Sequence, residues 1–236
     1  RVTKKMTEPQ VTGRRKALWD AFCHNQKITE NSTLLFDTDH ESIVRVRQVG
    51  KTLSRSILSR SESMEARVIA ETNILLKDIE HNSEQYDGLI YMMFTRQNDD
   101  VIPLYIGKAE SKGRSNPVSA NIKDVARVKD KFARWGDNYQ YHIGDLSASV
   151  LPGHDARYVT LKYQHWAESL FVSYPAERPQ LKQDIWFWCK AWNKNNTGIW
   201  PEFGPIRLTF LEYLLIGVAS SLFPETLLNR EGHSRS

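Results

Sequence analysis

The sequence predicts an α+β fold: a small antiparallel β-sheet, made of a hairpin plus a third strand, flanked by helices, with an N-terminal helical extension. The hairpin is indicated by a continuous apolar run at 88–94, a turn signal at 97–100 and a second apolar run at 101–106. The helices are indicated by the apolar residues at helical spacing within 65–79 and by the long apolar stretch 208–223, which Pro224 ends.

The segments before the hairpin are predicted to be helical. We expect a short helix at 17–22, and the apolar residues within 39–60 recur at mostly helical spacing. Residues 1–80 are therefore predicted to form a helical extension to a domain that spans 81–236. Two interpretations of the extension stay open: its arginines contact DNA, or an amphipathic helix packs on the main domain with its arginines in solvent.

The domain after residue 81 is expected to continue beyond the hairpin with further short elements. These are a helix over 119–135 that ends at Gly136, a third short strand over 139–143 and a strand-like segment over 185–190.

Composition excludes several classes of protein. The 236 residues are 40% hydrophobic and 11% aromatic, which is enough for a buried core and excludes a disordered or collagen-like chain. The two cysteines are too few for a disulfide framework or a zinc site, so we expect a reducing, cytoplasmic setting. No apolar stretch is long enough for a membrane span, and we expect a soluble protein. The chain begins at Arg1 rather than Met, as expected of a fragment or a processed chain.

The net charge of +4 is concentrated in one part of the chain. Between Pro103 and His142 there are eight Lys or Arg residues against four Asp or Glu residues. A stripe of this kind can follow a phosphate backbone, although a solvated helix face has the same pattern. The residues predicted to bind nucleic acid are Lys112, Arg114, Lys123, Arg127 and Lys131.

The hairpin carries a more specific pattern. Its first strand contains Gly88-Leu89-Ile90-Tyr91, its second contains Tyr105-Ile106-Gly107-Lys108, and Arg134, Glu212 and Asn229 follow in that order. This order over residues 86–230 resembles the GIY-YIG nuclease superfamily. The long interval between the second tyrosine and the arginine is similar to its restriction-endonuclease-like branch.

The resemblance implies a function and its requirements. It implies a metal-dependent endonuclease that hydrolyses DNA phosphodiester bonds in restriction or phage defence, with Mg²⁺ as cofactor and Mn²⁺ as a substitute. Double-stranded DNA is the expected substrate, and a homodimer is compatible with one site per chain. The alternative is a DNA-binding module that has kept the fold without catalysis. A third hypothesis, ranked last, is a protein-interaction domain that uses the tryptophans at 186–192.

Glu212 is the candidate metal ligand. It is the only charged residue within 208–223, and an ionised carboxylate on an apolar helix is costly unless it is paired or binds a metal. One carboxylate plus several waters is a ligand set that suits Mg²⁺. From the residues alone, a glutamate at the helix rim paired with an arginine fits equally well; the resemblance favours the metal.

The other candidates take their roles from the resemblance. Tyr91 is expected to act as general base or to position the water, Tyr105 to assist by hydrogen bonding, and Lys108 to supply positive charge to Tyr91; as an alternative, both tyrosines are core aromatics. Arg134 is expected to hold the scissile phosphate, with Arg114 as the competing candidate.

Two further residues complete the predicted catalytic set. His142, expected in the third strand, is a second phosphate contact, a proton carrier or a structural histidine. Asn229 is expected to hold the site together or to contact phosphate, with a simple turn asparagine as the alternative.

Overall fold

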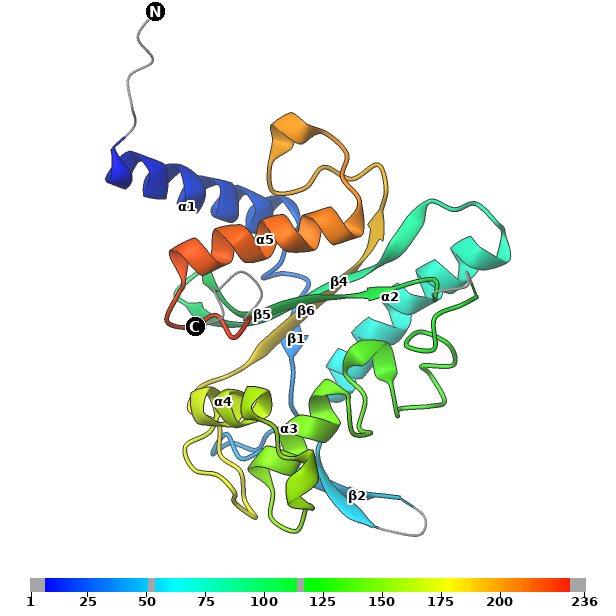
Figure 1. Ribbon diagram of the computed structural model, residues 1–236, viewed down its shortest axis with the longest axis vertical. Coiled ribbons are helices and arrows are strands. Elements are labelled where there is room, and N and C mark those ends of the chain that lie inside the picture. Colours follow the sequence, from blue (N-terminus) through cyan, green and yellow to red (C-terminus); the bar gives the residue numbers. More distant parts are fainter. Residues whose placement is uncertain (1–6, 51–53, 114–116, 230–236) are drawn as a thin grey trace, which may run out of the picture.

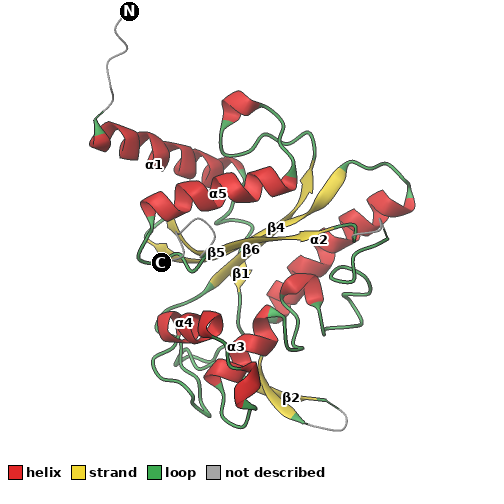
Figure 2. Ribbon diagram, viewed as in Figure 1, coloured by secondary structure: helices red, strands yellow, loops and turns green. Residues whose placement is uncertain are grey.

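The structure is a computed structural model that describes residues 7–50, 54–113 and 117–229. Its helices are α1 (Glu8–Asn25), α2 (Glu62–Glu80), α3 (His142–Val150), α4 (Leu161–Leu170) and α5 (Leu208–Leu222), with short 3₁₀ turns η1 (Phe132–Arg134), η2 (Ala156–Tyr158) and η3 (Pro201–Phe203). Its strands are β1 (Thr33–Leu34), β2 (Val46–Val49), β3 (Arg55–Leu58), β4 (Tyr86–Gln97), β5 (Asp100–Glu110) and β6 (Trp186–Asn193). The predicted α+β class is confirmed (Figures 1 and 2).

The main sheet is antiparallel, with strand order β1-β6-β4-β5. The predicted hairpin is confirmed as β4–β5, in which Tyr91 pairs with Gly107 and Met93 pairs with Tyr105. The strand-like segment expected over 185–190 is confirmed as β6, which lies beside β4 in the sheet. The central strand β4 is apolar and buried from Leu89 to Phe94 because both faces of the sheet are covered there.

Each face of the sheet has its own apolar core. The face that carries Ile90 and Met92 packs against α1 and α5, and Trp188 and Trp192 belong to this core. The opposite face carries Tyr91 and packs against α2, α3 and α4. Figure 1 shows α1 and α5 on one side of the sheet and the other three helices on the opposite side.

The outer edge of β5 is covered by the end of the described chain. The Leu228 N–H donates to the Leu104 carbonyl at 2.7 Å. The Asn229 side chain accepts from the Ile106 N–H and donates to the Ile106 carbonyl, both at 2.8 Å. Backbone groups that an edge strand would leave unpaired are therefore satisfied at the residue between Tyr105 and Gly107.

The helical structure predicted for 39–60 is wrong. This segment contains β2 and β3, which pair as a separate two-stranded sheet with Val46 opposite Leu58. Gly50, directly after β2, has a φ of 103°, a backbone conformation that favours glycine over other residues. The β-branched valines of this segment suit a strand as well as a helix, so their spacing alone misled the prediction.

The helix expected over 119–135 and the strand expected over 139–143 are also wrong. The described residues from 117 to 141 form turns, apart from η1, and α3 begins at His142. Asp124 has a φ of 57°, which interrupts a helix. The chain also folds closely on itself at Gly136, where an added Cβ would lie 1.8 Å from the Asp130 carbonyl oxygen. Buried anchors such as Trp135 hold this irregular path.

The described part of the predicted extension joins the rest of the chain. Its strand β1 pairs with β6, and α2 packs beneath the main sheet. The boundary at residue 80 therefore does not separate two cores, although a distinct role in DNA contact for residues 1–80 stays a prediction. Among the described helices, none is both long and apolar enough to cross a membrane.

Replacing Asn229 by Ala is expected to destabilise the fold. The change removes two hydrogen bonds and leaves the Ile106 N–H and carbonyl without these partners, at an expected cost of about 1–3 kcal/mol. Urea unfolding followed by circular dichroism measures the loss. The exposed Asn195→Ala is the matched control and is expected to change the free energy of unfolding by less than about 0.5 kcal/mol. Equal losses in the two variants would contradict this role for Asn229.

Candidate active site

The hydroxyl-bearing ring of Tyr91 lies directly against Gly107 on the neighbouring strand. A Cβ added at residue 107 would lie 2.7 Å from both Cε2 and the hydroxyl oxygen of Tyr91. Tyr91 is buried, so its ring has little room to move away. The glycine that ends the Tyr105-Ile106-Gly107 sequence therefore makes space for the tyrosine of the other strand.

His142 links Tyr91 to a second tyrosine. The Tyr91 hydroxyl lies 3.2 Å from Nε2 of His142, and Nδ1 of His142 lies 2.8 Å from the hydroxyl of Tyr163 on α4. Burial, together with the charges of Lys162 and Arg134, holds the pKa of His142 well below its usual value. The imidazole is therefore neutral at pH 7, with one nitrogen as donor and the other as acceptor.

Aromatic rings enclose this chain of three residues. The ring of His142 lies 5.1 Å from that of Tyr105, 4.7 Å from Trp135 and 5.2 Å from Trp166, centroid to centroid. Burial raises the pKa of Tyr91 well above its usual value, and the neighbouring Tyr105 adds to this effect. Tyr91 is thus a protonated hydroxyl at neutral pH, suited to hydrogen bonding and not to acting as a phenolate.

Arg134 lies within electrostatic range of this aromatic cluster, which consists of Tyr91, Tyr105, Trp135, His142, Tyr163 and Trp166. It belongs to a turn with an unusual backbone. The residues of η1 all have positive φ, at 35°, 51° and 77° for Phe132, Ala133 and Arg134. The turn is held in place by the Ala133 N–H, which donates to the Asn121 carbonyl at 2.6 Å. It is also held by Arg60, whose guanidinium donates to the Trp135 carbonyl at 2.8 Å. Such strained conformations cluster at functional sites.

The guanidinium of Arg134 acts electrostatically on Tyr91 and on the carboxylate of Asp145 in the first turn of α3. It lies 5.2 Å from the ring centroid of Tyr141 and forms no ion pair with the described part of the chain. Its charge lowers the pKa of Tyr91, against the dominant effect of burial. The arginine predicted to hold phosphate is therefore near the tyrosine predicted to position the water. Arg114, the competing candidate, lies outside the described residues.

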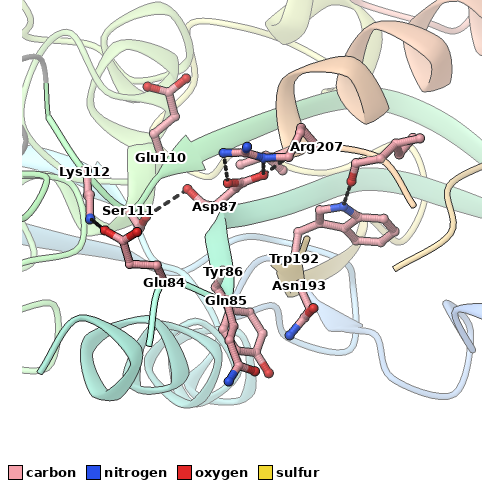
Figure 3. A network of polar contacts seen from close by, with 12 residues as sticks. Glu84, Gln85, Tyr86, Asp87, Glu110, Ser111, Lys112, Trp192, Asn193 and Arg207 are labelled. Atoms are coloured by element: carbon pink, nitrogen blue, oxygen red, sulfur yellow. Dashed lines mark hydrogen bonds and ion pairs between the residues drawn. The ribbon is translucent and has the colours of Figure 1, made fainter. Parts of the chain in front are cut away.

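Glu212 approaches from the helix on the opposite side of the sheet. It is half-buried on α5, and its negative charge raises the pKa of Tyr91, which places it within electrostatic range. The start of α5 is fixed by Asp87, which accepts two hydrogen bonds of 2.7 Å from Arg207 and one of 3.1 Å from the Leu208 N–H (Figure 3). This contact sets the position of Glu212 one turn further along the helix.

The described residues around Glu212 provide few metal ligands, so they suit a cation that the protein binds weakly. Within the described residues, no group of three or more His, Cys, Asp or Glu side chains is placed to hold a metal ion. A single half-buried carboxylate fits Mg²⁺, which keeps several of its waters, and does not fit a structural zinc site.

Lys108 points away from Tyr91. It follows Gly107 on β5, and successive residues of a strand face opposite sides of the sheet. Its ammonium pairs with Glu110 on the same strand. The cation that acts on Tyr91 is instead Arg134, so the structure does not bring Lys108 together with the tyrosine it was predicted to assist.

The residues predicted to bind nucleic acid are distributed over turns and not over one helix face. Lys112 donates to Glu84 at 2.8 Å (Figure 3), and Arg127 pairs with Asp124 at 3.4 Å. Lys123 is exposed and Lys131 is half-buried. Their role in DNA binding stays a prediction.

Two residues that lie beside His142 were not identified from the sequence. Tyr163 and Lys162 lie in the first turn of α4, where Tyr163, Trp166 and Leu170 form its buried face. This spacing of three and four residues was a signal for an amphipathic helix, although nothing in it indicated a partner for His142.

Comparison of the chain with protein-family models, curated proteins and solved structures finds no match.

The buried histidine is expected to make stability depend on pH. Because its pKa is lowered in the folded state, the unfolded chain takes up a proton first as the pH falls below about 6.5. The stabilisation is complete above that pH and is lost below it, by up to about 1.4 kcal/mol per pH unit. Unfolding free energies measured between about pH 5 and 8 should fall less in His142→Phe than in the wild type.

The exposed His40→Phe is the control for this measurement. It should keep the wild-type pH dependence. An identical dependence in the wild type and His142→Phe would show that His142 titrates as an ordinary histidine.

Proposed function

We propose that the protein is a metal-dependent endonuclease that hydrolyses DNA phosphodiester bonds with a GIY-YIG-like site. The observation that carries the proposal is the hydrogen-bonded chain Tyr91–His142–Tyr163, with the charges of Arg134 and Glu212 in electrostatic range of Tyr91. Burying a chain of polar side chains costs free energy that apolar residues in the same space would not cost. Such a chain is therefore a candidate for a functional role.

The residues fall into complementary roles in hydrolysis. With His142 neutral, the Tyr91 hydroxyl can donate to Nε2 while the Nδ1–H donates to Tyr163. Tyr91 then orients a water through its oxygen lone pairs, and His142 is the base that a proton can reach through the hydroxyl. Arg134 offers a planar fork of donors to the phosphate oxygens. Asn229 holds β5 and hence the ring positions of Tyr105 and the Gly107 space.

Glu212 is the residue that would hold the metal. Bound there, Mg²⁺ or Mn²⁺ would supply Lewis-acid stabilisation of negative charge on phosphate oxygens. The proposed substrate is double-stranded DNA, and a homodimer would cut both strands. The proposed role is restriction or phage defence in the cytoplasm.

A second candidate is a DNA-binding module without catalysis. One observation favours it: Tyr91 and His142 are each only 2% exposed, so neither presents a hydroxyl or imidazole at the surface. A binder requires no metal, whereas the nuclease does, and binding by either would weaken with salt.

Replacing Glu212 by Gln tests the proposed function. Gln keeps the size of the side chain but removes the charge, so metal-dependent nicking of supercoiled plasmid should fall by about 100-fold or more. The wild type should cut with Mg²⁺ or Mn²⁺ and not with EDTA. The matched control is the exposed Glu225→Gln, expected to cut at the wild-type rate.

Two outcomes would decide against the nuclease. Retained DNA binding by the wild type without cleavage in any metal would favour the binding module. Cleavage by Glu212→Gln at the rate of the wild type would remove Glu212 from the mechanism.

A further inference from the structure

Four aromatic side chains at η3 and on the first turns of α5 are exposed. Between 41% and 61% of the surface of each is accessible to solvent, for Trp200, Phe203, Phe210 and Tyr213. The rings of Trp200 and Phe203 pack edge to face with centroids 5.1 Å apart, and those of Phe203 and Phe210 do so at 5.4 Å. These four residues form the aromatic patch. Apolar side chains gathered in this way on a surface indicate a site that another molecule covers.

A groove lies beside the aromatic patch, between α1 and α5. Its volume is about 590 Å³, and Trp200 and Tyr213 belong to its lining. Figure 1 shows α1 and α5 next to each other, with the orange segment that contains η3 beside them. The charged residues of the lining are Arg14 and Arg15 on α1 and Glu202 on η3. The remaining lining is small or apolar: Val11, Ala17, Leu18, Leu214, Gly217 and Val218.

Gly217 leaves the α5 wall of this groove open. It lies in the interior of α5, where a glycine costs about 1 kcal/mol relative to alanine. Apart from the adjacent backbone of its own helix, an added Cβ would meet no atom of the described residues within 4 Å. Packing within the described chain therefore gives no reason for a glycine at this position. A second polypeptide that approaches α5 closely supplies one.

The surface is complementary to itself in shape and in charge. The aromatic patch is exposed next to an apolar groove, so in two copies related by a twofold axis the patch of each can fill the groove of the other. Arg15 and Glu202 are both exposed and carry opposite charges on different elements of the lining, which lets each copy offer a counter-charge to the other. The carboxylate in the groove disfavours a nucleic acid, whose backbone is negative throughout.

The exposed area is consistent with a stable dimer. An aromatic side chain can bury about 150–250 Å², so four rings that are about half exposed contribute roughly 300–500 Å² in each copy. A typical stable interface buries about 800 Å² in each partner. The aromatic patch therefore supplies about half of that area, and the groove adds to it.

We propose that the aromatic patch and the groove between α1 and α5 form the interface of a homodimer with twofold symmetry. The assignment rests on the proposed function for the use of the dimer, because two sites held on one duplex would cut both strands in one binding event. The interface itself rests on the exposed rings, the groove and Gly217. Glu212 does not line the groove, so the interface does not need the proposed metal ligand.

Sedimentation equilibrium tests the interface. The wild type should have twice the mass of one chain, which is 27.3 kDa. Gly217→Leu fills the groove, and the monomer should stay folded because leucine is a better helix former than glycine. The dissociation constant of its dimer should rise by about 30-fold or more. The matched control is Ala66→Leu, at an exposed position of α2, which should keep the wild-type constant.

A second pair of variants changes the aromatic patch. Phe203→Asp removes a ring and places a charge in the interface, so the dissociation constant should again rise by about 30-fold or more. Leu161→Asp replaces an equally exposed apolar residue on α4 and should leave the constant unchanged. Circular dichroism shows that each variant is folded. If Phe203→Asp does not fold, Gly217→Leu decides.

Cleavage of supercoiled plasmid tests the use of the dimer. Gly217→Leu should nick the first strand as fast as the wild type, whereas the linear product should appear more slowly. Linear product formed at the wild-type rate by a monomeric Gly217→Leu would overturn this use. A wild-type dimer that Gly217→Leu dissociates, without cleavage by the wild type in any metal, supports the interface and contradicts the nuclease.

Three results would overturn the interface. The first is a wild type that is monomeric at every protein concentration measured. The second is a dissociation constant that is the same in the wild type and in Gly217→Leu. The third is a monomeric wild type whose binding of a single-stranded oligonucleotide is abolished by Phe203→Asp, which would assign the rings to nucleic-acid bases.

Discussion

The hydrogen bonds of the buried His142 are the interaction on which the rest of the site depends. They join β4, α3 and α4 within the core on one face of the main sheet. A neutral imidazole can satisfy one donor and one acceptor only in a fixed tautomer, so Tyr91 and Tyr163 must present complementary hydroxyl orientations. The aromatic rings around it exclude water and thereby keep the pKa of His142 low.

The candidate residues come from both faces of the main sheet. Tyr91 belongs to the face that packs against α3 and α4, whereas Glu212 lies on the helix that covers the other face. The absence of a side chain at Gly107 lets the Tyr91 ring extend over β5 towards its outer edge. Asn229 supports that edge from outside. Asp87 fixes the start of α5 through Arg207 and Leu208, and this contact helps to set the position of Glu212 one turn further along the helix.

The hairpin and α5 could be predicted from the sequence because their apolar runs are long and their ends are clear. The residues between 117 and 141 could not be predicted, because their path depends on contacts such as Ala133 with Asn121 and the close approach at Gly136. The structure brings His142 within hydrogen-bond distance of Tyr91, but at the start of a helix and not in the strand that the sequence predicted. The outward direction of Lys108 followed from strand alternation with Gly107 and could have been foreseen.

The most direct test of the account is a double-mutant cycle on the histidine's two partners. Single-turnover plasmid cleavage by Tyr91→Phe, Tyr163→Phe and the double variant measures whether the three residues act as one unit. The account predicts that each single change slows cleavage and that the second change adds little to the first, because either one breaks the chain through His142. Losses that simply multiply, or a Tyr91→Phe variant that cuts as fast as the wild type, would contradict it.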